Sequence, residues 1–250
     1  MQTFHFSPLC SIHRPVLIIK NYLYVITTLI LVLGSTECLW AQPYNVTQLM
    51  QGDIVFIRST SRQSTALEQG TGSIWTHVGI LFKERQQWVV YEATQPVKAT
   101  PLSEFVGPAR SRDSQFVIKR VSSDIIQLNE SSIRRLKQEC AKDFGKSYDI
   151  FFNWDDSKLY CSEYVFKCFQ RTFKVELSEF ETLGDMNQDS PVIQSMIDQR
   201  WARNAKTDDE RLQILSQVYT HKVITPVQLY ESPLLECVQS HEGPTCPKGK

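Results

Sequence analysis

Two cysteines stand seven positions apart in the stretch KLYCSEYVFKCF, residues 158–169, and their positions predict different chemistry. Apolar residues at helical spacing predict a helix that begins at about Cys161. The first turn of a helix has unpaired N–H groups and the positive end of the dipole, which favour a thiolate. Cys161 is therefore a candidate nucleophile, although its spacing also fits simple packing. Cys168 falls in mid-helix, where a free cysteine is typically buried, and about 10 Å of helix rules out a disulfide between the two.

A thiol nucleophile needs a base, and three histidines follow the N-terminal region: His77, His221 and His241. His221 lies between a predicted helix and a predicted strand, and His241 lies in a tail that contains proline and glycine. Histidines at such places are usually solvated. His77 lies within a predicted buried strand, so it is the candidate base.

A predicted hairpin supplies the third group. The runs THVGILF (76–82) and QWVVYEA (87–93) are joined by a polar segment, 83–86, which is typical of a hairpin turn. Pairing that is symmetric about this turn makes facing residue numbers sum to 169 and places His77 opposite Glu92. A carboxylate there can accept the imidazole N–H while the other nitrogen faces the thiol. A shift of one residue would turn Glu92 to the other face.

Two simpler interpretations of these residues stand beside a Cys–His–Glu site. His77 and Glu92 could form a charged pair on a solvated sheet face, although both strands are largely apolar. A zinc site is less well supported, because no second Cys or His lies at short ligand spacing to any of the three. The residues alone support a catalytic site and a purely structural role about equally. They predict no metal and no cofactor.

The elements that position these residues are predicted as strands first and helices afterwards, in one α+β domain. Further strands are predicted at 54–57 and 116–121, a polar loop at 61–73, helices from Ser131 to a stop at Gly145, at 190–201 and at 208–217, and a late edge strand at 223–229 that contains Pro226.

The N-terminal region predicts export. An uncharged apolar run, Tyr22 to Leu33, follows Arg14 and Lys20, and it is shorter than the about 20 residues that span a bilayer. Cleavage after Ala41 makes residues 1–41 a signal peptide and residues 42–250 a secreted or periplasmic domain without a stable membrane span. An uncleaved N-terminal anchor is the alternative. Cleavage leaves an odd number of cysteines, so at least one is unpaired, and Cys237 and Cys246 are close enough in sequence for a small disulfide loop.

The charge balance excludes one class of partner. Lys and Arg number 27 and Asp and Glu number 27, and no basic cluster is interleaved with aromatic residues. Binding to nucleic acid is therefore not predicted. The sequence does not indicate an oligomeric state.

The order of the motifs resembles a known family. The segments GDIVF, THVGI, VVYEA, YDIFFNW, YCSEYVFKCFQ and VITPVQLYESP, over about residues 50–235, are similar to the YaeF/YiiX permuted papain-like amidases, relatives of the NlpC-type cell-wall peptidases. This resemblance implies a circularly permuted papain-like (NlpC-type) fold, in which an antiparallel sheet packs against helices and the nucleophile stands at a helix N-terminus. It implies Cys161 as nucleophile, His77 as base and Glu92 as the orienting carboxylate.

The resemblance also implies an exported cysteine amidase or peptidase that acts on a peptide or amide substrate, such as peptidoglycan stem peptides. Tyr160 is a further candidate for lining the substrate cleft, while Tyr148 and Asp149 match the family pattern without a chemical role. One alternative is lipid acyl transfer or thioester hydrolysis of the lecithin retinol acyltransferase type, although Tyr160 stands where those proteins usually have asparagine. The other is a non-catalytic binding module, which the presence of all three site residues disfavours.

Overall fold

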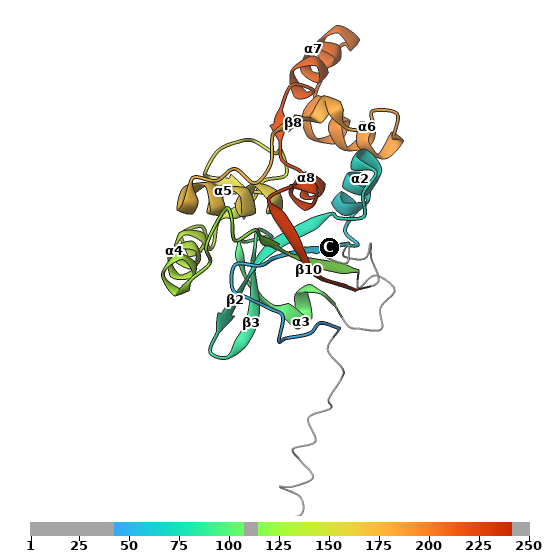
Figure 1. Cartoon of the computed structure of the whole chain (residues 1–250). Coiled ribbons are helices and arrows are strands. Elements are labelled where there is room, and N and C mark those ends of the chain that lie inside the picture. Colours follow the sequence, from blue (N-terminus) through green and yellow to red (C-terminus); the bar gives the residue numbers. More distant parts are fainter. Residues whose placement is uncertain (1–42, 108–114, 242–250) are drawn as a thin grey trace, which may run out of the picture. The chain divides into compact units, whose positions relative to one another are not determined.

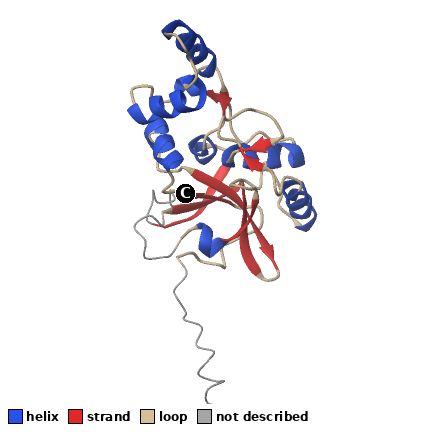
Figure 2. Cartoon of the chain, turned by 180° about the vertical axis from the view of Figure 1, so that it is seen from behind, coloured by secondary structure: helices blue, strands red, loops and turns tan. Residues whose placement is uncertain are grey.

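Continuous apolar runs build a central antiparallel sheet with two buried faces (Figures 1 and 2). The computed structural model describes residues 43–107 and 115–241, except the side chain of Arg62. The six strands lie in the order β10-β5-β1-β2-β3-β4. Their bounds are β1 Ile54–Ile57, β2 His77–Glu84, β3 Gln87–Glu92, β4 Lys98–Pro101, β5 Phe116–Val121 and β10 Leu235–His241. The strands predicted at 54–57, 76–82, 87–93 and 116–121 are all found, within one or two residues at their ends.

Each face of the sheet has its own core. Ile54 and Phe56 of β1 face a layer made by helices α4 (Glu130–Ala141), α5 (Cys161–Phe173) and α8 (Pro226–Glu231). Val55, between them, faces the opposite side, where the short helix α3 (Leu102–Phe105) packs with Leu49. The period of two along a strand puts neighbouring side chains on opposite faces.

Helix α4 begins and ends for local reasons. The side chain of Asn129 accepts hydrogen bonds from the N–H groups of Ser131 and Ser132, at 3.1 and 3.0 Å, which satisfies two donors of the first turn. The helix ends at Ala141, before the predicted stop at Gly145. Gly145 has a φ of +87°, so the chain turns there through a conformation that favours glycine.

The prediction of a polar loop at 61–73 is wrong, because this segment forms α2 (Arg62–Thr71). Ser61 caps its first turn and Gly72, with a φ of +68°, ends it. Only Ala66 and Leu67 give the helix an apolar stripe, which is too weak a pattern to detect in the sequence. They pack in a separate helical core with α6 (Pro191–Ile197), a π-helical turn η2 (Asp198–Ala202) and α7 (Asp208–Val218), which lie above the sheet in Figure 1.

The prediction of a late strand at 223–229 is also wrong. The strand here, β9, is limited to Lys222–Val223, which pairs with β8 (Glu181–Thr182). Pro226 then opens α8, and Thr225 caps that helix by accepting the N–H of Gln228 at 3.3 Å. Proline at the first position of a helix loses no hydrogen bond, so the residue that suggests an edge strand is a helix start.

The last strand of the sheet, β10, was not expected from the sequence. It pairs with β5 along the edge of the sheet, with a register shift between Cys237 and Gln239. Cys237 lies in this strand and is disulfide-bonded. Its proposed partner, Cys246, lies outside the described residues.

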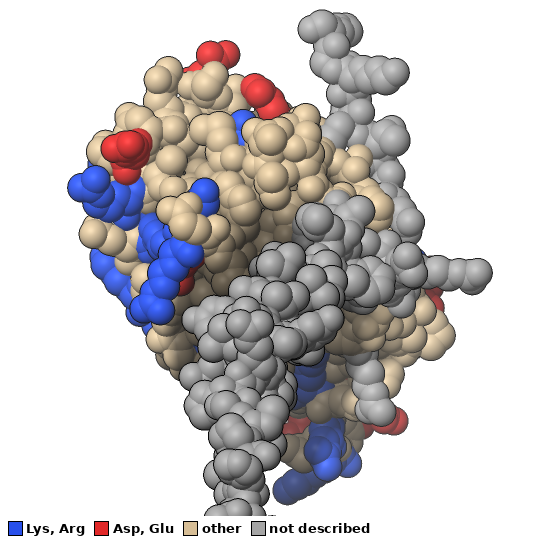
Figure 3. All heavy atoms as spheres, turned by 90° about the horizontal axis from the view of Figure 1, so that it is seen from below, with Lys and Arg blue, Asp and Glu red and all other residues tan. Residues whose placement is uncertain are grey.

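The predicted signal peptide or anchor, residues 1–41, also lies outside the described residues. Within residues 43–107 and 115–241, no helix combines the length and the apolar character needed to cross a bilayer. On the face shown in Figure 3, Lys and Arg side chains gather along the left edge and again at the bottom, with Asp and Glu side chains beside both groups.

Candidate active site

The hairpin that carries His77 and Glu92 is tighter than predicted. Facing residues are Ile80 with Tyr91 and Glu84 with Gln87, so their numbers sum to 171 instead of 169. The turn needs only Arg85 and Gln86, whose φ angles are +45° and +71°, as in a two-residue hairpin turn of the primed type. A shift of two residues preserves the face that each side chain occupies.

His77 and Glu92 therefore meet diagonally across the ladder. Continuing the observed register places Gly79, not His77, opposite Glu92. A Cβ on Gly79 would lie 2.4 Å from Cγ1 of Val90 and 2.8 Å from the carbonyl oxygen of Tyr91, so the site tolerates no side chain here. The same Cβ would lie 3.3 Å from the Cβ of Glu92, so a side chain at position 79 would also crowd this residue.

The imidazole of His77 is oriented by the carboxylate of Glu92, which is in turn fixed by the hydroxyl of Thr100. His77 Nε2 lies 2.5 Å from Glu92 Oε2, and the two side chains are only 17% and 8% exposed. Thr100 of β4 donates its hydroxyl to the other oxygen, Glu92 Oε1, at 2.5 Å. Because Nε2 is engaged by Glu92, Nδ1 is the nitrogen left for another partner.

That partner is Cys161, the first residue of α5. The start of α5 is fixed by two bonds to one residue: Ser162 Oγ donates to the carbonyl of Ile224 at 2.6 Å, and the N–H of Ile224 donates to Tyr160 Oη at 3.2 Å. Glu163 accepts the N–H of Tyr160 at 3.2 Å and forms an ion pair with Lys167. The acid thus serves the first helical turn and does not lie against the thiol.

The electrostatics of the pair favour a thiolate and an imidazolium. Burial alone raises the pKa of Cys161, but the charge of His77 and hydrogen bonds from His77, Tyr148 and the N–H of Ser162 lower this pKa below its ordinary value. Burial alone lowers the pKa of His77, but the charge of Cys161 and hydrogen bonds to Cys161 and Glu92 raise it to about 10. Hydrogen bonds from His77 and Thr100 similarly outweigh burial and lower the pKa of Glu92.

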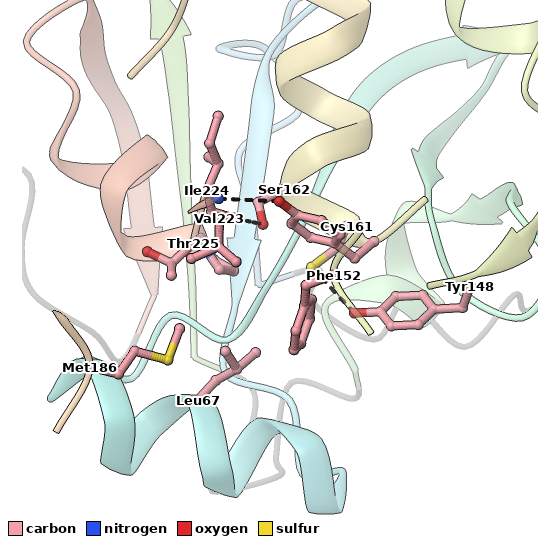
Figure 4. A pocket seen from close by; sticks show the side chains of 11 residues that line it. Leu67, Tyr148, Phe152, Cys161, Ser162, Met186, Val223, Ile224 and Thr225 are labelled. Atoms are coloured by element: carbon pink, nitrogen blue, oxygen red, sulfur yellow. Dashed lines mark hydrogen bonds between the residues drawn. The ribbon is translucent and has the colours of Figure 1, made fainter. Parts of the chain in front are cut away.

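Tyr148 is a site residue to which the sequence assigned no role. It lies in β6 (Ser147–Tyr148), a two-residue strand that pairs in parallel with β7 (Lys158–Leu159) just before α5. Its hydroxyl points at Cys161, with Oη 4.0 Å from Sγ (Figure 4). Burial and the neighbouring thiol keep the pKa of Tyr148 well above its ordinary value, so the hydroxyl retains its proton. The only signal in the sequence was its place in the YDIFFNW motif.

Two cavities adjoin the site. A cleft of about 560 Å³ contains His77 and Glu92 and is lined largely by hydroxyl and amide side chains, among them Ser59, Ser61, Ser64, Thr94 and Gln95. Cys161 instead lines a small apolar pocket of about 10 Å³ (Figure 4). Leu67 and Tyr148 line both, so they form the boundary between the thiol and the cleft.

The remaining candidates lie elsewhere or serve packing. Tyr160 is 2% exposed and stacks edge-to-face on Phe152 at 5.2 Å, and it lines the apolar pocket but not the large cleft. The rings of His221 and His241 contact Trp201 and Phe116, respectively. Cys168 is a free thiol in the core and is not bonded to Cys161, as its position in the helix predicts.

Comparisons with known proteins agree on one family. Residues 48–239 match the family model described as permuted papain-like amidase enzyme, YaeF/YiiX, C92 family. The uncharacterized protein YiiX of Escherichia coli (strain K12) is 29% identical over 191 residues, which cover 76% of this chain and 86% of that protein. The crystal structure of the metalloprotein yiiX from Escherichia coli O157:H7 superposes with a TM-score of 0.67 at 29% identity, covering 78% of this chain and 98% of that one. With its antiparallel sheet, its helical layer and a match over most of its length, the chain belongs to the YaeF/YiiX family of permuted papain-like amidases.

Proposed function

We propose that the chain is an exported cysteine hydrolase that cleaves amide bonds with Cys161, His77 and Glu92 as its catalytic residues. The observation that carries this proposal is the contact between a thiol at a helix start and an imidazole whose far nitrogen is held by a carboxylate. Such an arrangement of nucleophile, base and orienting group supports acyl transfer on several unrelated folds. The family to which the chain belongs is one of amidases.

The proposed reaction follows from the protonation states. The Cys161 thiolate attacks the amide carbonyl, and the new oxyanion is held by the N–H of Cys161 and the hydroxyl of Tyr148. His77, as imidazolium, gives its Nδ1 proton to the leaving amine. The neutral ring then takes a proton from water as the water attacks the thioacyl intermediate, which releases the carboxylic acid and restores the thiolate.

The substrate class follows from the lining of the cleft. Serine, threonine and glutamine side chains around His77 can hydrogen-bond the backbone and polar groups of a peptide. Stem peptides of peptidoglycan are polar and extended, and they lie where an exported enzyme would meet them. Cys161 is only 2% exposed, so substrate reaches the sulfur when the boundary opens at Leu67, while Tyr148 keeps its hydroxyl at the sulfur.

Acyl transfer from a lipid is the second candidate, and one observation favours it. The pocket beside Cys161 is lined by apolar side chains, including Leu67, Phe152 and Met186. Its volume of about 10 Å³ suits at most about one water molecule, however, whereas an acyl chain needs far more room. The larger cleft, with its hydroxyl and amide side chains, therefore favours peptides over lipids.

A metal has no place in this mechanism. The relative from Escherichia coli O157:H7 is described as a metalloprotein. Within the described part of this chain, no group of three or more His, Cys, Asp or Glu side chains is arranged to hold a metal ion. Since the described donors do not fit a resident metal, no step of the proposed reaction passes through one.

The proposal is tested by incubating the protein with peptidoglycan stem peptides and, separately, with acyl lipids. We expect new primary amines from the peptides and no free or transferred acyl groups from the lipids. Cys161→Ala should abolish amine release. Release of acyl groups alone would favour the lipid reaction, and the absence of both with folded protein would favour a binding module.

A further inference from the structure

Three side chains from distant parts of the sequence form a hydrogen-bond chain that ends at Cys161. Arg200 Nη2 donates to Gln63 Oε1 at 3.1 Å, and Gln63 Nε2 donates to Tyr148 Oη at 2.7 Å. The Tyr148 hydroxyl in turn lies 4.0 Å from Cys161 Sγ. Gln63 belongs to α2 and Arg200 to η2. The separate helical core that contains these two elements is therefore connected to the thiol.

The direction of this chain is set by arginine. A guanidinium group donates hydrogen bonds and cannot accept them, so its partner on Gln63 must be the amide oxygen. The amide nitrogen is then the end that faces Tyr148. Because Tyr148 Oη already accepts a hydrogen bond from Gln63, its own O–H is left to be donated towards Cys161. A reversed amide would accept the tyrosine proton and turn it away from the sulfur.

Arg200 is itself held in place. Its guanidinium lies 5.2 Å from the centre of the Phe152 ring, a distance at which a cation and a ring attract each other. Phe152 sits in a tight turn in which the Asp149 carboxylate accepts the N–H groups of Phe151 at 2.8 Å and Asn153 at 2.6 Å. The backbone of η2 is π-helical, and π-helical turns in proteins occur frequently at functional sites.

The charge of Arg200 is compensated only from a distance, by Asp149. Among the residues that the structure describes, no acidic side chain forms an ion pair with it, and its Nη1 is buried without a hydrogen-bond partner. Burial lowers the pKa of Arg200, and the charge of Asp149, which acts on it from beyond ion-pair distance, opposes this only in part. A cation kept in this state polarises the amide that it bonds.

We propose that Gln63 and Arg200 are positioning residues, which turn the hydroxyl of Tyr148 towards the sulfur of Cys161. The hydroxyl then stabilises the thiolate before the reaction and the oxyanion during it. The second half of this statement rests on the proposed function, whereas the effect on the thiolate does not. The separate helical core of α2, α6, η2 and α7, which contributes none of the three proposed catalytic residues, thus helps His77 to set the protonation state of the nucleophile.

The decisive variant is Gln63→Glu, which keeps the size of the side chain and its bond to Arg200. The second carboxylate oxygen can only accept a hydrogen bond. The Tyr148 hydroxyl therefore donates to this oxygen and no longer donates to the thiol. The readout is the pH midpoint of Cys161 alkylation by iodoacetamide in the folded full-length protein, followed by mass spectrometry. We expect the midpoint to rise and the alkylation rate near pH 7 to fall about tenfold, the effect of losing a hydrogen bond to a charged group.

The negative charge that Gln63→Glu introduces could itself raise the alkylation midpoint of Cys161, without any effect on the hydrogen-bond chain. Two controls separate the effect of charge from the effect of the hydrogen bonds. Gln199→Glu places the same charge on η2, where Gln199 lines the same surface groove as Gln63 and Arg200 but takes no part in the hydrogen-bond chain. Tyr148→Phe removes the hydroxyl, so in that background Gln63→Glu should produce little further shift. Arg200→Met releases the amide and should give a smaller rise of the same sign, while melting curves confirm that each variant is folded.

Each outcome decides the proposal. A shift in Gln63→Glu that is absent from Gln199→Glu and lost in the Tyr148→Phe background supports it. An unchanged midpoint in Gln63→Glu, or an equal shift with and without the tyrosine hydroxyl, overturns it. Alkylation needs no substrate, so it tests the hydrogen-bond chain independently of catalysis. A shifted midpoint in a protein that hydrolyses no amide would contradict the proposed function and still support the roles of Gln63 and Arg200.

Discussion

The start and the middle of helix α5 hold two equally buried thiols in different surroundings. Cys161 is 2% exposed and Cys168 is 0% exposed. Cys161 meets the imidazole of His77, the hydroxyl of Tyr148 and a first-turn N–H group. Cys168 instead contacts the neutral thiol of Cys140, whose pKa burial and that contact raise well above the ordinary value.

The difference shows that burial does not decide whether a thiol is reactive. A cation, Arg171, also stands near Cys168, but it is already paired with Asp143 and Glu139. His77 has its carboxylate on the far side of the ring, so its charge remains directed at Cys161. The partners at the helix start, and not the solvent, therefore set the state of the sulfur.

Replacing each of the two cysteines by alanine should give the largest difference between the start and the middle of the helix. Cys161→Ala should lower amide hydrolysis by at least about a thousandfold, because the nucleophile is lost. Cys168→Ala should leave hydrolysis close to wild type and cost only about 1 kcal/mol of unfolding free energy. Rates and denaturant melts measure the two effects, and a Cys168 variant as inactive as the Cys161 variant would remove the distinction.

His77→Gln should make the helix start resemble the middle. Without a cation beside it, the buried Cys161 thiol should titrate at or above the unperturbed value of about 8.5. Amide hydrolysis should fall by about 10² to 10⁴, because this variant lacks the proposed general acid and base. The midpoint of Cys161 alkylation checks this, and a midpoint as low as in the wild type would show that the imidazole does not stabilise the thiolate.

Glu92→Gln should move the alkaline limit of the reaction. The pKa of His77 is about 10, so hydrolysis should fall as pH rises through that value and the imidazolium loses its proton. The charge and hydrogen bond of Glu92 contribute to raising this pKa, so without them the alkaline limb should shift to lower pH. The matched control is Glu104→Gln, which removes the same charge from the same cleft. An equal shift in both variants would point to the overall charge of the cleft and against the pairing.

Thr100→Val should have the smallest effect of the four. It keeps the shape of the side chain and removes the hydroxyl that donates to Glu92 Oε1. Loss of a hydrogen bond to a charged acceptor should raise the pKa of Glu92 and lower kcat/KM by about threefold to tenfold. The measurement is kcat/KM on the same peptide, and an unchanged value would mean that Glu92 is held well enough by His77 alone.

The sequence was sufficient to predict the residues that lie on strong local patterns. Both strands of the hairpin have clear apolar runs, and an error of two residues in register did not matter because the side-chain period of a strand is two. The position of Cys161 at a helix start was predictable because the start of a strongly amphipathic helix could be read from the spacing of its apolar residues. The diagonal meeting over Gly79 depends on the turn type and could not be derived without it.

The sequence was insufficient where long-range packing decides the structure. Segment 61–73 has too few apolar residues to indicate a helix by itself, and its helix packs on residues that follow more than a hundred positions later. Gln63 and Arg200 are 137 positions apart, so no local motif links them. Pro226 is compatible both with an edge strand and with the first position of a helix. The cap formed by Thr225 shows that it begins a helix.

The most direct test of the account is alkylation of the native protein over a range of pH, with every cysteine followed separately by peptide mass spectrometry. Cys161 should be labelled with a midpoint clearly below about 8.5, while Cys140 and Cys168 should stay unlabelled until the protein is unfolded. Equal labelling of Cys161 and Cys168, or a Cys161 midpoint at or above the unperturbed value, would contradict a thiolate held by His77.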